Sequence, residues 1–282
     1  MAIYYLSLKN FSRSDGSNAP SSAAYRAGER IRDERSGRIY DHSARRDVLH
    51  KEIIVPARFA DTPLEWARDR SSLWNAAEAA EKRRNSRVAR EYTVALPAEL
   101  NSEQRLVLAR GFAQELSDRY RFAVDLAVHA PRDFPGSDPR NFHAHLLATT
   151  REVTADGLGA KTSLELSDAA RRQLGLAPTV YELVHVRERW AAVTNQALQE
   201  AALAARIDHR TLREQGIERE PSSWRPRVSY DQELAERRPV GVPDLEELRR
   251  QAREKWLRAR EERASRAPAR GADRGRDDDH GL

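Results

Sequence analysis

Cysteine is absent from this chain of 282 residues. Its absence excludes a disulfide framework and any metal site built from thiolates. No stretch approaches the roughly 20 consecutive apolar residues that a membrane-spanning helix needs. The first residues lack the basic leader and apolar core of a signal peptide. We therefore expect a soluble, cytoplasmic protein that does not insert into a membrane.

Charge of one sign is only slightly in excess. Lysine and arginine total 49 residues against 44 acidic residues, so the net charge is +5. A basic balance favours a polyanionic partner, although an excess this small is a weak indication of nucleic acid. Because 39% of the residues are hydrophobic and 33% are charged, the chain can form a packed core and still carry long charged surfaces.

Three of the eight histidines fall within one short region. His129 ends one apolar run and His143 and His145 begin another, with a break rich in turn-forming residues over 132–140. Short apolar runs bounded by turn residues are typical of strands, so the region predicts a β-hairpin. Residues two apart on a strand face the same side, which places His143 and His145 together. His129, on the partner strand, can reach the same face.

Three imidazoles that converge from two strands predict a metal site. Two histidines at this spacing also occur by chance on ordinary solvated strands, and the third histidine is what favours metal binding. A site of three histidines leaves coordination positions open, which suits catalysis rather than a structural role.

The apolar patterns predict an α/β (α+β) fold, with a central, mainly antiparallel five-stranded sheet and flanking helices. The expected strands span 3–11, 48–55, 88–96, 123–130 and 142–151. The expected helices span about 23–31, 62–84, 104–120 and 181–205, the first capped by a serine at 21 or 22 and the third by a capping box from Asn101. The segment 153–161 is turn-like. The helix that carries Tyr25 should cover the histidine face of the sheet.

Other residues are candidates on their own patterns. Tyr25 lies early in a helix, where a tyrosine is more often a packing residue than a nucleophile. Glu91 lies in a strand, where its carboxylate is either exposed or bound to a metal-ligating imidazole. The segment 206–212 is either a solvated loop or a basic, DNA-facing finger. Trp224 and Arg225 combine an aromatic ring with a cation, which can stack a base and hold a phosphate.

The chain resembles the MobA/MobL family of plasmid mobilisation relaxases, which belong to the HUH endonuclease class. The resemblance runs from Ile3 to about Pro221 and rests on motifs in the family's order: Ser22-Ala-Ala-Tyr25-Arg-Ala-Gly-Glu29, Leu73-Trp-Asn75, Glu91 before Ala95-Leu-Pro97, His129-Ala-Pro131, Asn141-Phe-His143-Ala-His145-Leu-Leu-Ala-Thr-Thr-Arg151, Gly157 to Lys161, Arg206-Ile-Asp-His-Arg210 and Gln215-Gly-Ile-Glu-Arg-Glu-Pro221. Two positions depart from it. Phe142 stands where the family often has proline, and His42 where it often has tyrosine.

The resemblance implies a DNA relaxase with an HUH relaxase-like fold and a helical C-terminal extension. Such an enzyme nicks one strand at a plasmid origin of transfer by transesterification, forms a 5′-phosphotyrosyl intermediate and later rejoins the ends. Tyr25 matches the nucleophile, and His129, His143 and His145 match the ligands of a divalent metal, Mg²⁺ or Mn²⁺. Glu91 orients a histidine or accepts a proton. The implied DNA contacts are Arg26, Arg151, Lys161, Arg206, Arg210, Trp224 and Arg225.

The implied partners are single-stranded and duplex plasmid DNA at the transfer origin, accessory mobilisation proteins and a type IV coupling protein. We divide the chain into a nicking domain over 1–230, a charged helical segment over 231–265 and a disordered tail over 266–282. The alternatives are an HUH rolling-circle replication initiator, a metal-dependent hydrolase that uses the same histidines, and a non-catalytic origin-binding protein of the same fold.

Overall fold

The computed structural model of the chain describes residues 2–132, 137–218 and Arg258. The chain divides into a unit that ends at Pro221 and a second unit from Ser222 onward. The predictions for 231–265 and 266–282, and those for Trp224 and Arg225, lie outside the described residues apart from Arg258. Among the helices of the described part, none is long and apolar enough to cross a lipid bilayer.

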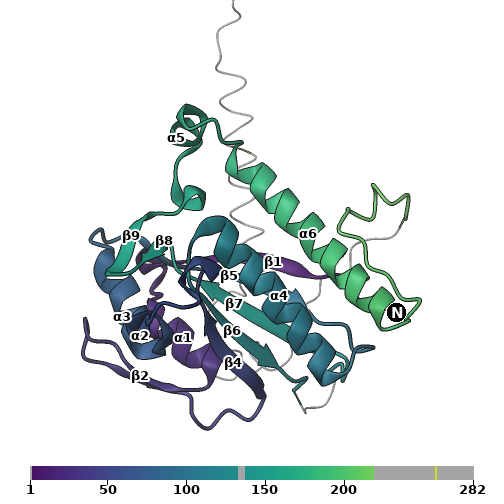
Figure 1. Cartoon of the computed structure of the whole chain (residues 1–282), viewed down its shortest axis with the longest axis horizontal. Coiled ribbons are helices and arrows are strands. Elements are labelled where there is room, and N and C mark those ends of the chain that lie inside the picture. The colour runs from purple at the N-terminus through teal and green to yellow at the C-terminus, as the bar shows by residue number, and fades with distance from the viewer. Residues whose placement is uncertain (1, 133–136, 219–257, 259–282) are drawn as a thin grey trace, which may run out of the picture. The chain divides into compact units, whose positions relative to one another are not determined.

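A five-stranded sheet forms the centre of the first unit (Figure 1). Its strands lie in the order β1 (Leu6–Ser12), β5 (Arg87–Ala95), β7 (His143–Ala148), β6 (Val124–His129) and β4 (Val48–Ile54). Every neighbouring pair is antiparallel. The predicted antiparallel five-stranded sheet is therefore confirmed, and the hairpin that carries the histidines supplies two of its inner strands.

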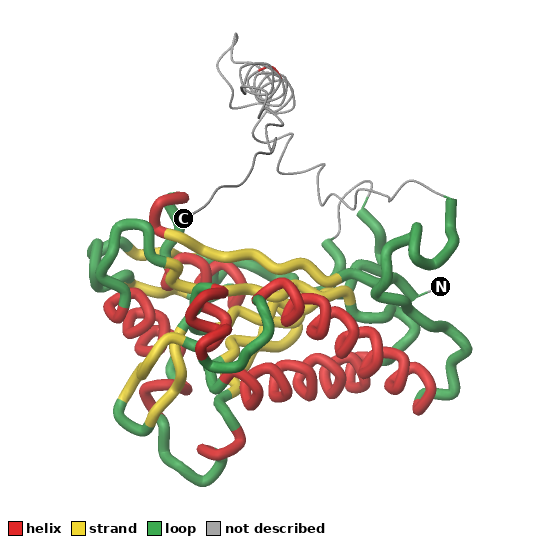
Figure 2. Tube along the Cα trace, turned by 90° about the horizontal axis from the view of Figure 1, so that it is seen from above, coloured by secondary structure: helices red, strands yellow, loops and turns green. Residues whose placement is uncertain are grey.

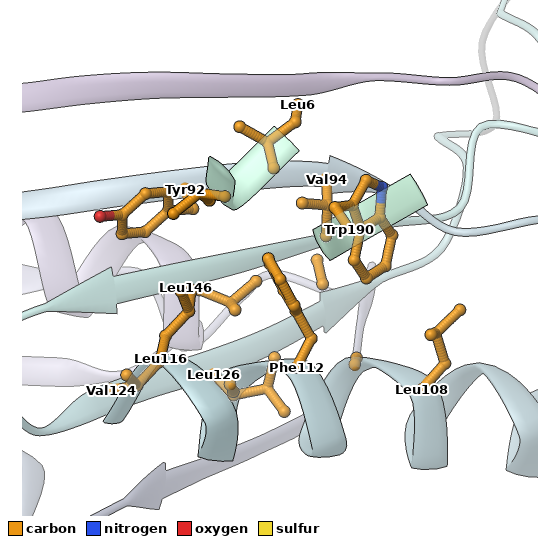
Figure 3. Close-up of a cluster of buried hydrophobic side chains, with 14 of the residues drawn as sticks. Leu6, Tyr92, Val94, Leu108, Phe112, Leu116, Val124, Leu126, Leu146 and Trp190 are labelled. Atoms are coloured by element: carbon orange, nitrogen blue, oxygen red, sulfur yellow. The ribbon is translucent and has the colours of Figure 1, made fainter. Parts of the chain in front are cut away.

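Two long helices, α4 (Ser102–Tyr120) and α6 (Thr179–Glu200), lie side by side along one face of this sheet (Figures 1 and 2). Phe112 and Trp190 pack with ring centroids 4.9 Å apart, in a cluster with Leu126 and Leu146 (Figure 3). α4 begins at the predicted capping box, in which Asn101 and Gln104 each accept the other's backbone N–H.

Three helices cover the opposite face, which is the face of the histidines: α1 (Ala19–Ala27), α2 (Glu65–Arg68) and α3 (Arg70–Ala80). Ala23 and Ala24 are fully buried against this face in a cluster with Trp74 and Leu147. Because alanine side chains are short, the backbone of α1 can lie close to the sheet. The helix that carries Tyr25 covers the histidine face, as expected.

The first helix differs from its prediction at both ends. It begins at Ala19, with Asn18 as the cap that accepts the N–H of Ser21, so the serines lie inside the helix and do not cap it. It ends before Gly28, whose φ of +59° is the left-handed conformation that glycine adopts at low cost. The residues beyond form strand β2 (Arg30–Arg32), paired with β3 (Ile39–Asp41).

The segment 153–161 was predicted to be turn-like, and that prediction is wrong. It belongs to a two-stranded hairpin of β8 (Arg151–Thr154) and β9 (Gly157–Lys161). The remaining elements are short: the 3₁₀ turns η1 (Arg13–Asp15), η2 (Ala57–Phe59) and η3 (Ser163–Glu165), and the helix α5 (Asp168–Gln173).

Candidate active site

Three histidines converge on the face of the sheet that α1 covers. His129 on β6 pairs directly with His143 on β7, and His145 lies two residues further along β7. The ring centroids are 4.8 to 5.2 Å apart, and one ring nitrogen of each histidine lies within 4.8 Å of the other two. The sequence pattern therefore placed the three imidazoles together correctly.

Each imidazole is held by a hydrogen bond to an oxygen. His143 Nδ1 lies 3.0 Å from the carbonyl oxygen of Asn141, and His145 Nδ1 lies 2.8 Å from Glu91 Oε1. Because these oxygens accept, both rings carry the proton on Nδ1 and keep the lone pair of Nε2 available to a metal. His129 instead donates from Nε2 to the carbonyl oxygen of Arg26, at 2.8 Å, which leaves its Nδ1 as the acceptor.

The surroundings favour the neutral form of two of these rings. Burial, together with the neighbouring His145 and His143, lowers the pKa of His129 to about 3. Burial, with a further contribution from His145, lowers the pKa of His143 to about 4. Metal binding requires the neutral imidazole, so both histidines are in the ligand form at neutral pH.

Glu91 is a buried carboxylate in the wall of the site, 4% exposed. Burial by itself raises the pKa of Glu91, but hydrogen bonds from Arg26 and His145 outweigh it and hold that pKa far below its ordinary value. The carboxylate therefore stays ionised. Arg26 is bound through all three guanidinium nitrogens, to Glu91 and to the carbonyl oxygen of Ser22. These contacts favour a role for Arg26 in fixing Glu91 over its predicted contact with phosphate.

Tyr25 lies in the last turn of α1, next to the Arg26 carbonyl that holds His129, and is 40% exposed. Arg132 Nη2 donates to the phenol oxygen at 3.0 Å. His42 meets the phenol ring edge to face, with centroids 5.3 Å apart. Tyr25 is therefore a partly exposed tyrosine whose hydroxyl accepts from a guanidinium, and its role as a nucleophile stays a prediction.

Arg45 joins the tyrosine to the histidine triad, and the sequence patterns did not single it out. Its guanidinium lies 4.4 Å from the centroid of the Tyr25 ring and donates to the Tyr25 carbonyl oxygen at 2.6 Å. It also lies 3.2 Å from His129 Nδ1 and donates to Asp47 at 2.8 Å. A shallow hollow of about 410 Å³, lined in part by Arg45, Lys51 and Gly28, lies beside it.

The other predicted DNA contacts are not part of this cluster. Arg151 and Lys161 both pair with Glu81, at 2.9 and 3.1 Å, beyond the other end of β7. Arg206 donates to the carbonyl oxygens of Leu203 and Ala205. Arg210 pairs with an aspartate two residues before it, at 2.7 Å, and no hydrogen bond or ion pair links it to the histidine triad. The predicted role of these side chains in DNA binding stays a prediction.

An antiparallel five-stranded sheet between two helical layers, with the histidine cluster under a tyrosine-bearing helix, is an HUH relaxase-like fold. A family model described as "MobA/MobL family" matches residues 17–227, and the chain belongs to that family. It is 39% identical over 241 residues to the mobilization protein MobL of Acidithiobacillus ferridurans. That match covers 79% of this chain and 61% of the relative. It is also 32% identical over 236 residues to the 43 kDa relaxation protein of Salmonella typhimurium. That match covers 78% of this chain and 57% of the relative.

The fold is also similar to a solved structure described as "Molecular Basis of Vancomycin Resistance Transfer in Staphylococcus aureus". That similarity has a TM-score of 0.59 at 25% identity, and it covers 74% of this chain and 100% of the other. The chain thus spans about three fifths or less of the length of the two curated relatives, whereas the structural match extends over the whole of the solved chain.

Proposed function

We propose that this chain is a DNA relaxase that nicks one strand at a plasmid origin of transfer, to initiate conjugative mobilisation. One observation carries the proposal. The exposed Tyr25 hydroxyl, bonded to Arg132, lies on a helix whose backbone is hydrogen-bonded to a histidine of the triad. Membership of the MobA/MobL family supports the same activity.

The triad fits a divalent metal by its donor set. His129, His143 and His145 would hold the ion, and no other described residue is bonded to Nε2 of the last two. Imidazole nitrogens alone favour zinc-like metals, and family membership favours Mg²⁺ or Mn²⁺, which we propose as the cofactor. Such an ion, when bound, polarises the scissile phosphate and offsets the charge on its oxygens. Glu91 would keep the His145 ring in the orientation that binding needs.

The proposed reaction is a transesterification by Tyr25. A bond forms between the phenol oxygen and the scissile phosphorus as the bond from phosphorus to the 3′ oxygen breaks. The phenol loses a proton and the leaving 3′ oxygen gains one, so the exchange consumes no water. Arg132, a permanent cation, would stabilise the negative charge on the phenol oxygen. The phosphotyrosyl bond conserves the energy of the broken ester, so the reverse reaction can rejoin the strand.

The proposed substrate is plasmid DNA in the cytoplasm, with a single-stranded segment at the nick inside a duplex origin. An in-line attack needs the scissile phosphate free of the double helix, so the strand must be melted around it. Accessory mobilisation proteins and a type IV coupling protein are the proposed partners for melting and transfer. Basic side chains such as Arg206 and Arg210 would contact the sugar-phosphate backbone.

The test is a covalent adduct with an oligonucleotide that carries the nick site and a label at its 3′ end, so that the fragment with the 5′-phosphate at the nick is followed. With Mn²⁺, wild type should leave a labelled protein band on a denaturing gel. Tyr25→Phe should abolish that band, a loss of at least about a thousandfold given the size of nucleophile knockouts, and still bind the DNA. Tyr181→Phe is the matched control, because Tyr181 is also exposed (63%) and lies on α6.

Each of the other outcomes would change the proposal in a defined way. An undiminished band with Tyr25→Phe would show that another residue is the nucleophile. Cleavage to a free 5′-phosphate, without an adduct, would identify a metal-dependent hydrolase. Binding of the origin without cleavage by wild type would identify a non-catalytic origin-binding protein.

A further inference from the structure

A second hollow lies at the other end of β5 and β7 from the paired histidines. It forms where α3 ends, where β5 begins and around η3, and Figure 1 shows the β8–β9 hairpin beside α3. The volume of the hollow is about 710 Å³. Five of the residues that line it are basic: Lys82, Arg83, Arg87, Arg151 and Lys161. We call it the basic cleft.

The acidic groups of the basic cleft are buried beneath its cations. The Glu81 side chain is 4% exposed and pairs with Arg151 at 2.9 Å and with Lys161 at 3.1 Å. The Glu165 side chain is 3% exposed and pairs with Arg87 at 3.5 Å. These carboxylates fix the positions of three cations while the cations remain accessible. The Arg87 side chain is 50% exposed and that of Lys161 is 34% exposed.

The rim of the basic cleft adds two cations without acidic partners. Lys82 and Arg83 are exposed, and their side chains form no hydrogen bond or ion pair with any other described residue. Five cations therefore face a hollow whose two acidic groups are covered. Charges of one sign in a concave, protein-walled surface concentrate their field and attract the opposite charge.

The chemistry of the lining selects the kind of anion. Arginine and lysine on a surface are the side chains that contact nucleic-acid phosphates. None of the described residues that line the cleft is aromatic, so it lacks the platform on which bases stack. Most of the residues that line it are polar or charged, whereas a small-molecule pocket is typically lined by apolar side chains. A sugar-phosphate backbone fits this lining better than an exposed base or a small cofactor.

The position of the basic cleft relates it to the candidate active site. Thr93 on β5 pairs with His145 on β7. Arg87 lies six positions before Thr93 on β5, which at a rise of ~3.3 Å per residue places the two about 20 Å apart along the strand. We propose that the basic cleft holds the phosphodiester backbone of the substrate DNA a few nucleotides from the nick. The proposal rests on the relaxase function, and it assigns Lys82 and Arg83 as specific contributors to affinity.

The test compares two double variants whose side chains are all exposed. Lys82→Ala/Arg83→Ala removes the two unpaired cations of the cleft. Arg38→Ala/Arg68→Ala is the matched control, since both of these arginines are exposed and their side chains have no partner among the residues described. The probes are a fluorescein-labelled single strand of about 30 nucleotides and a hairpin duplex of the same composition, with chelator present so that no cleavage occurs. Fluorescence anisotropy gives Kd at several salt concentrations.

For a backbone site, the cleft variant should raise Kd about tenfold and the control less than twofold. The slope of log K against log salt should become shallower by about 1.4 for the single strand, or about 1.8 for the duplex, if two phosphate contacts are lost. The probe that shows the larger loss identifies the form of DNA that occupies the cleft. Circular dichroism and thermal melting verify that both variants are folded.

The two proposals fail in different ways. If the cleft variant binds both probes as wild type does and forms the Tyr25 adduct normally, the basic cleft is not a DNA site and the relaxase function stands. If wild type binds neither probe, both proposals are wrong. If only the adduct is missing while the cleft variant still binds DNA more weakly than wild type, the backbone site stands and the nicking reaction does not.

Discussion

At the scale of single residues, the site consists of contacts between positions far apart in the chain. Arg45 contacts Tyr25, 20 positions before it, and His129, 84 positions after it. No spacing rule links such positions, so the sequence patterns missed Arg45 and Asp47. The histidines could be predicted because their relation is local: two share a strand and the third lies on the next strand of one hairpin.

Glu91 gives a prediction at this scale. Glu91→Gln keeps the shape of the side chain but removes the negative charge that orients His145 and pairs with Arg26. We expect Mn²⁺ affinity to fall about 10- to 100-fold, the usual effect of losing a partner of a ligating histidine. Isothermal titration calorimetry with Mn²⁺ measures it. Glu103→Gln, at an exposed position of α4, is the control and should bind as wild type does. Equal affinities in all three proteins would remove Glu91 from the site.

At the scale of elements, regular alternation was predictable and local irregularity was not. Strands β4 to β7 and the capping box of α4 followed directly from apolar periodicity and from Asn101. The hairpin of β8 and β9 was missed because Gly157 and Gly159 read as turn residues, although both lie within β9. A strand rich in glycine lacks the alternating apolar side chains by which a strand is predicted. Here the pairing with β8 across the turn holds β9 in the extended conformation.

The junction between α1 and the following loop can be tested at Gly28. Its φ is +59°, and a Cβ there would lie 3.1 Å from Val48 Cγ2 and 3.4 Å from Arg45 Cβ. Gly28→Ala should lower the free energy of unfolding by about 1–2 kcal/mol, because alanine is strained in this conformation. The substitution should also slow adduct formation, because the new Cβ would press on Arg45, whose guanidinium contacts the Tyr25 ring.

Gly111 supplies the control for that substitution. It lies inside α4 at an exposed position, and a Cβ there meets nothing within 4 Å. Gly111→Ala should therefore raise the free energy of unfolding by about 0.5–1 kcal/mol through helix propensity. Urea denaturation measures both variants. Equal stability of Gly28→Ala and wild type would show that the junction tolerates a side chain.

At the scale of the whole folded unit, the buried histidines couple stability to pH. An unfolded histidine binds a proton near pH 6.5, whereas burial lowers the pKa of His143 to about 4 and that of His129 to about 3. Between these values the unfolded chain binds more protons, so stability falls as pH falls. We expect the free energy of unfolding, without metal, to drop by roughly 4 kcal/mol from pH 6.5 to 4.5, about half of it from each histidine.

Urea denaturation at a series of pH values measures this slope. His143→Asn should make this slope shallower, because one of the two histidines is gone, whereas Tyr25→Phe leaves both histidines in place and should keep it. A flat profile in wild type between pH 6.5 and 4.5 would show that these imidazoles are protonated in the folded protein. The fold class was predictable from the sequence, but this dependence was not, because it arises from burial.

His145 lies in the middle strand of the five, with β5 bonded on one side and β6 on the other. Fraying in a sheet starts at the outermost strands, which here are β1 and β4. The central histidine of the triad is therefore anchored in a strand that is bonded on both sides. Opening of either edge strand alone would leave β6 paired with β7, and that pairing is what sets His129 opposite His143.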